Sequence, residues 1–166
     1  MKIKNKNLFF ITMSSLLYFG WKWKRKKEKY NNQKKEKVIY KQECALEVYR
    51  AWIQLYQMDK NIEEFLIENN YHSIAIYGLG RVGKSLFKEL SKSNITIDYV
   101  IDRKLSVSKG SYESILCYNP DAVLPKTDLI IIAVPGEIDN ISLHLANCNS
   151  KVLSIQDILQ SINLGY

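Results

Sequence analysis

The segment from Ser73 to Ser85 constrains this chain more than any other, because a short apolar run passes directly into a glycine turn and the start of a helix. Gly78, Gly80 and Gly83 follow the run at the spacing G-x-G-x-x-G. In such a turn the first glycine allows the tight bend, the second lets backbone N–H groups approach a pyrophosphate, and the third lets the helix pack close to the strand. The pattern predicts a phosphate cradle at the positive end of a helix dipole.

A second apolar run, residues 95–101, is followed by an acid, at the position where a nucleotide-binding unit of this pattern carries one. Asp102 lies nineteen residues after Gly83. A carboxylate at this position is expected to accept hydrogen bonds from a ribose. Strand, turn, helix, second strand and terminal acid together predict a Rossmann-like unit, with NAD or NADP among its candidate ligands. The alternative is a structural glycine turn in an α/β fold that has lost its ligand.

The same residues also satisfy a different phosphate-binding pattern, because Gly78 is followed after four residues by Gly83-Lys84-Ser85. That pattern belongs to nucleoside triphosphatases, which need an acid on a later strand to hold magnesium. The best later strand, residues 128–134, runs into Pro135-Gly136 without an acid. Since only about eighty residues follow the turn, the triphosphatase interpretation is disfavoured.

The rest of the chain alternates between strand and helix patterns. The predicted fold is α/β, with a single Rossmann-like parallel sheet of about five strands in order 3-2-1-4-5 and an N-terminal helical arm before it. After Asp102 we expect a polar loop over 103–111, strands over 115–118, 128–134 and 151–155, and helices over 119–124, 137–147 and 157–162.

Charge divides the chain, because thirteen of its 24 Lys and Arg residues lie in residues 1–41 and the remainder is mildly acidic. A nucleic-acid-binding role for the α/β part is therefore not expected. The predicted organisation is an apolar, basic-flanked segment over 1–23, a basic linker or polar helix start over 24–41, a helical arm over 42–70 and the nucleotide-binding domain over 71–166.

The uncharged run from Asn7 to Trp21 favours a membrane anchor. Fifteen helical residues reach only about 22 Å, against a hydrocarbon core of about 30 Å, so a single-pass span and an interfacial anchor both stay open. Trp21 and Trp23 suit the membrane interface, and the lysines after the run favour the cytoplasmic side. We therefore expect residues 8–23 to hold the protein at the cytoplasmic face of the membrane, and the protein to be cytoplasmic otherwise. A cleaved signal peptide and a misassigned start codon are the alternatives.

In the helical arm, apolar residues recur at helical spacing. Leu46, Tyr49, Ile53 and Tyr56 form one stripe, and a neighbouring stripe carries further apolar residues, among which Trp52 is expected to be a packing residue. That neighbouring stripe consists of Val48, Trp52 and Leu55. A second helix is expected from Ile62 to Glu68, with Asn61 or Asp59 as N-cap.

The sequence shows no complete catalytic constellation. Cys44, Cys117 and Cys148 lie far apart, so neither a metal site nor a disulfide framework is expected. His72 and His144 have no catalytic motif around them, and no residues remain to build a substrate domain for a dehydrogenase. A binding module, or an enzyme completed by a partner chain, is the expected class.

Residues 52–158 resemble small Rossmann-like domains of bacterial surface-polysaccharide clusters, which occur alone or fused to glycosyltransferases and sugar acyltransferases. The matching stretches are Ile74 to Gly83, Tyr99 to Arg103, Leu124 to Pro135 and Leu153 to Leu159. The resemblance implies an accessory protein of surface-glycan synthesis that binds a nucleotide or a uridine-type nucleotide-sugar, with a glycosyltransferase as partner. The candidate cofactor-binding residues are Gly78, Leu79, Gly80, Arg81, Val82, Gly83, Asp102, Arg103, Val134 and Pro135.

A second resemblance competes with the first. Gly78 to Gly83 together with Ile101-Asp102-Arg103 is similar to the NAD-binding regulatory domains of potassium transport systems. Those domains usually carry a Gly-Asp-Ala segment and a longer stretch after the second strand, whereas only residues 104–127 intervene here. Three function classes therefore stay open: the accessory protein, an NAD(P)-dependent oxidoreductase or nucleotide-sugar-modifying enzyme completed by a partner, and an NAD-sensing subunit of an ion transporter.

Overall fold

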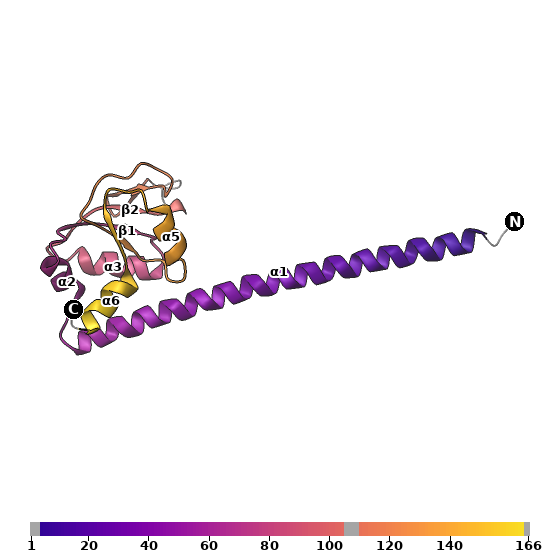
Figure 1. Cartoon of the computed structure of the whole chain (residues 1–166), viewed down its shortest axis with the longest axis horizontal. Coiled ribbons are helices and arrows are strands. Elements are labelled where there is room, and N and C mark those ends of the chain that lie inside the picture. Colours follow the sequence, from indigo (N-terminus) through magenta and orange to yellow (C-terminus); the bar gives the residue numbers. More distant parts are fainter. Residues whose placement is uncertain (1–3, 105–109, 165–166) are drawn as a thin grey trace. The chain divides into compact units, whose positions relative to one another are not determined.

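The computed structural model describes residues 4–104 and 110–164, and divides the chain into two compact units, residues 1–40 and 41–166. The first unit consists of the helix α1, which runs from Lys4 to Gln57 and continues into the second unit (Figure 1). The helix covers residues 24–41, so of the two alternatives for this stretch the structure has the helix. Among the described residues no helix is long and apolar enough to cross a membrane.

The second unit is built on a sheet of six strands in the order β3-β4-β2-β1-β5-β6. All neighbouring pairs are parallel except β3 and β4, which are antiparallel. The α/β class is confirmed. The sheet has six strands instead of the expected five, because the two-residue strand β3 adds an edge to β4; the five parallel strands, β4-β2-β1-β5-β6, follow the expected order 3-2-1-4-5. The strands are β1 (Ser73–Tyr77), β2 (Thr96–Ile101), β3 (Ser111–Tyr112), β4 (Ile115–Tyr118), β5 (Leu129–Ile132) and β6 (Lys151–Ser154).

The parallel strands end at the same level of the sheet. Tyr77 at the end of β1 pairs with Ile101 of β2 and with Ile132 of β5, and Ile132 pairs in turn with Ser154 of β6. From β1 the chain leads through α3 (Arg81–Leu90) to β2, whereas β5 leads through α5 (Ile138–His144) to β6 on the other side. The strand order therefore reverses between β1 and β5, at the place where open α/β sheets bind ligands.

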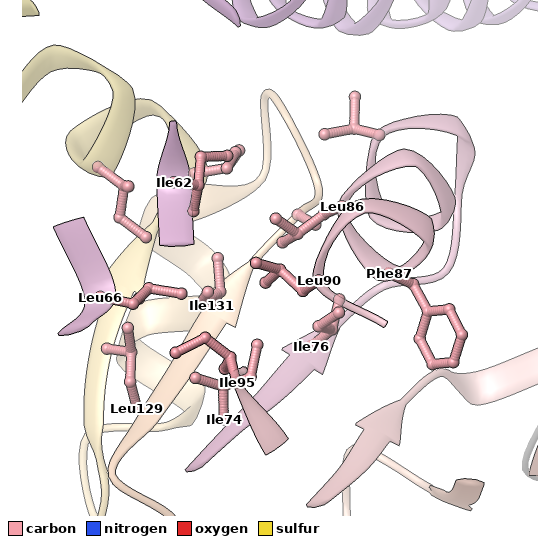
Figure 2. Packing of buried hydrophobic residues seen from close by; sticks show 14 of the residues in the cluster. Ile62, Leu66, Ile74, Ile76, Leu86, Phe87, Leu90, Ile95, Leu129 and Ile131 are labelled. Carbon is pink, nitrogen blue, oxygen red and sulfur yellow. The ribbon is translucent and has the colours of Figure 1, made fainter. Parts of the chain in front are cut away.

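Helices cover both faces of the sheet, which explains why β5 is fully buried along its length. One core joins β1 and β5 to α3, to α2 (Ile62–Glu68), to α6 (Ile155–Leu164) and to the end of α1. Figure 2 shows Ile62 and Leu66 of α2 and Leu86 and Leu90 of α3 around strand residues such as Ile131. The second core lies on the opposite face, where Ile141 and Leu145 close over the sheet.

The two apolar stripes at the end of α1 differ in burial. Val48, Trp52 and Leu55 are at most 5% exposed, whereas Leu46 and Ile53 are more than half exposed. Trp52 is a packing residue as expected, and its indole N–H also donates to Glu89 on α3. The expected α2 is present, and its N-cap is Asn61, whose side chain accepts the N–H of Glu64.

Three other expectations need correction. Residues 119–124 form no helix, because the Asn119 side chain accepts the N–H of Asp121 in an Asx turn that competes with a helical start. The helix expected over 137–147 is limited to Ile138–His144, and the closing helix extends from Ile155 to Leu164. Of the loop expected over 103–111, residues 103 and 104 are helical, Ser111 belongs to β3, and residues 105–109 lie outside the described residues.

Candidate functional site

The three glycines of the turn after β1 have different reasons to be glycine. Gly78 has a φ of 90°, and a side chain there would overlap Val134. A Cβ at Gly83 would overlap the carbonyl oxygen of Gly78, so the helix approaches the turn too closely for any side chain. At Gly80, in contrast, a Cβ would meet no atom within 4 Å. Packing therefore explains two of the glycines, and the third faces open space.

Gly80 is also the N-cap of α3, where its φ of −70° is one that any residue adopts. The helix begins at Arg81, and its first backbone bond runs from the N–H of Lys84 to the carbonyl of Gly80. Gly80 has no side chain that could cap this end by a hydrogen bond. The first-turn N–H groups have no partner within the helix and carry the positive end of its dipole. The helix start can therefore receive an anion.

Asp102 holds the glycine turn to the end of β2. Its Oδ2 accepts the N–H of Leu79 at 3.0 Å, and its Oδ1 accepts the N–H of Lys104 at 2.9 Å. The backbone adds a bond of 2.7 Å from the N–H of Gly78 to the carbonyl of Ile101. Asp102 therefore fixes the position of the glycine turn relative to the end of β2.

The side chains of the other turn residues divide into core and surface. Leu79 and Val82 are buried in the core, so only their backbone groups can serve a ligand. Arg81 is exposed, and so is Lys84, whose Nζ lies 5.9 Å from the centre of the Tyr112 ring. The turn thus presents backbone N–H groups and two cations rather than an apolar wall.

Val134 and Pro135 follow β5, and Val134 borders the glycine turn from the other side of the reversal point. The N–H of Ala133 donates to the carbonyl of Tyr77 at 2.9 Å, which extends the pairing of β5 with β1 beyond Ile132. Half-buried Val134 then lies against Gly78, as the overlap with an added Cβ shows. The structure therefore brings together the glycine turn, Asp102 and Val134, while Arg103 is exposed beside Asp102.

Tyr77 also lies at this edge of the sheet, although the sequence patterns did not single it out. Burial raises the pKa of its phenol; nearby Arg103 lowers the pKa, and the carboxylates of Asp121, Asp102 and Glu137 raise it. The phenol is therefore a neutral hydrogen-bond donor at physiological pH. Its position as the last strand residue before the first glycine is the signal that could have identified it.

One carboxylate and one thiol near the carboxyl ends of the strands have structural partners. Glu137 pairs with Lys41 at 2.6 Å. The Cys117 thiol contacts the backbone oxygen of Asp102 at 3.7 Å, and burial raises the pKa of this thiol. A protonated thiol is a weak nucleophile. Over the described parts of the chain, no three or more His, Cys, Asp or Glu residues gather as a metal site would require.

Searches of known protein families, of curated proteins and of solved structures find no match to this chain.

Proposed function

We propose that the second unit binds a nucleotide across the ends of β1, β2 and β5, and that it acts as an accessory binding protein without a complete catalytic site of its own. The observation that carries the proposal is the contrast among the glycines: Gly78 and Gly83 are required by packing, whereas Gly80 is not. A glycine that packing does not require, placed at the N-cap of a ten-residue helix, suits close approach of a phosphate.

The groups around the turn suit a nucleoside diphosphate. The N–H groups at the start of α3 would receive the phosphates, and exposed Arg81 and Lys84 would add charge-assisted contacts. Asp102 would accept a ribose hydroxyl while it holds the turn. A 2′-phosphate would face this carboxylate, so we expect NAD or a uridine-type nucleotide-sugar to bind better than NADP, with Arg103 and Lys104 reducing the difference.

The setting in surface-glycan synthesis rests on the resemblance of residues 52–158 to domains of polysaccharide clusters. A glycosyltransferase is the partner that this resemblance supports. The second unit has 126 residues and a single sheet, so we propose nucleotide binding for this unit and no hydride transfer within it.

A ligand screen tests the proposal. The full chain is heated in the presence of NAD, NADP, uridine diphosphate, guanosine diphosphate and their sugar conjugates, and the unfolding temperature is recorded. A ligand at a hundred times its Kd adds about 2.7 kcal/mol to stability, so binding gives a clear upward shift. At least one diphosphate should raise the temperature, and the corresponding nucleoside without phosphates should not. No shift with any of them would contradict nucleotide binding, and turnover of NADH or NADPH would favour the oxidoreductase.

A further inference from the structure

Aromatic side chains gather on α1 in the first unit and stay exposed there. Tyr18, Phe19, Trp21 and Trp23 lie within six residues and are each more than half exposed. Large apolar rings grouped on a surface mark a site of interaction. Because a helix turns every 3.6 residues, these four positions point to several sides of α1. They form a belt around the helix rather than the single apolar stripe that a partner helix or a protein groove would need.

Cations occupy the same level of the helix and contact these rings. The Arg25 guanidinium lies 4.1 Å from the centre of the Trp21 ring, and the Lys27 ammonium lies 5.2 Å from that of Trp23. Over residues 18–40 the helix carries nine Lys and Arg residues against two Glu, and every side chain there is exposed. The belt is therefore both aromatic and strongly basic.

We propose that residues 18–29, the aromatic-basic belt, bind the surface of an anionic membrane. Trp and Tyr favour the headgroup region, where an apolar ring and its polar edge are both satisfied. Lys and Arg are attracted there by anionic lipid, which is abundant on the cytoplasmic leaflet. A membrane surface offers both environments at one depth. A nucleic acid would match the charge but would leave four exposed aromatic rings at one helix level unexplained.

Vesicle sedimentation of the full chain tests the proposal, with phosphatidylcholine vesicles compared with vesicles that also contain phosphatidylglycerol. The wild type should sediment with the anionic vesicles at least about 10-fold more than with the neutral ones, and added salt should reduce the difference. The double variant Trp21→Ser/Trp23→Ser should lose most of the binding. The triple variant Lys24→Gln/Lys26→Gln/Lys27→Gln should bind both kinds of vesicle equally weakly.

Two control variants match these changes elsewhere in the chain. Leu46→Ser alters another exposed apolar residue of α1, and Lys88→Gln/Lys92→Gln removes exposed lysines of the second unit. Both should sediment like the wild type. Equal sedimentation of the tryptophan variant and the wild type would overturn the proposal. So would release of the wild type from anionic vesicles by a short single-stranded RNA, which would assign the belt to nucleic acid instead.

Discussion

The two ends of the sheet differ in how completely their polar groups are used. At the amino end, the Asp128 carboxylate accepts the N–H groups of His72 and Ser73, and the Thr127 hydroxyl donates to Asp98 at 2.7 Å. At the carboxyl end, the N-cap of α3 is Gly80, which offers no capping side chain and faces open space. We call the amino end the closed end, because its polar groups pair with one another, and the carboxyl end, with the space at Gly80, the open end. We propose that the closed end serves stability and that the ligand binds at the open end.

The largest effect should come from the glycines of the open end. Gly83→Ala places a methyl group on the Gly78 carbonyl, so the free energy of unfolding should fall by about 3 kcal/mol or more. Gly80→Ala has open space and an ordinary φ, and should change stability by less than about 1 kcal/mol. Urea unfolding of both variants measures the difference. Equal losses would mean that the two glycines have the same structural task.

The next largest effect concerns the hydrogen bond from the Leu79 N–H to Asp102, which holds the glycine turn at the open end in place. Asp102→Ala removes the acceptor for the Leu79 N–H, so nucleotide affinity should fall about 10-fold, the loss expected for one charged hydrogen bond. Because the turn itself loosens, the loss should persist for a 2′,3′-dideoxy nucleotide. Calorimetric titration with both ligands measures it, and exposed Asp139→Ala is the control. A loss confined to the ribose-bearing ligand would show that Asp102 acts on the ribose alone.

The sequence predicts those features of the fold and the site that depend on residues close together in the chain, and it does not predict contacts between residues far apart in the chain. The G-x-G-x-x-G spacing and the acid after β2 are local patterns, and they predicted the turn, the helix start and the neighbouring strand. The bond from Leu79 to Asp102 joins residues 23 positions apart, so no periodicity reports it. Likewise, both stripes of α1 are apolar, and only the packing of α1 into the core decides that Trp52 is buried and Ile53 is not.

At the closed end, loss of the Tyr99 hydroxyl should have a smaller effect on stability, and this effect should depend on pH. Its hydroxyl donates to the Pro125 carbonyl at 2.7 Å, and burial raises its pKa from 10.0 to about 12. The neutral phenol is favoured in the folded state, so its contribution to stability is complete below pH 10 and is lost as the pH rises towards 12. Tyr99→Phe should cost about 1 kcal/mol at neutral pH and should lose less stability than the wild type in this range. Parallel alkaline profiles of the two proteins would contradict this assignment.

The smallest effect is expected from Asp128, which is exposed. The N–H groups of Ser73 and His72 lower its pKa, so the carboxylate stabilises the fold above its unfolded pKa of about 3.9 and loses this contribution as the pH falls below that value. Asp128→Asn should therefore flatten the acid side of the stability profile without changing nucleotide affinity. The profile is obtained by urea unfolding at a series of acidic pH values. A change in affinity would show that the two ends of the sheet are coupled.

Calorimetric titration of the wild type and of Gly80→Val with the best nucleotide from the screen tests the central claim most directly. The valine side chain would occupy the open space at the N-cap of α3, where we place the phosphates. We expect the wild type to bind the nucleotide and Gly80→Val to show no measurable binding, although the variant should unfold at nearly the same temperature. Equal affinities of the two proteins would contradict the central claim, because the open turn would then lie outside the binding site.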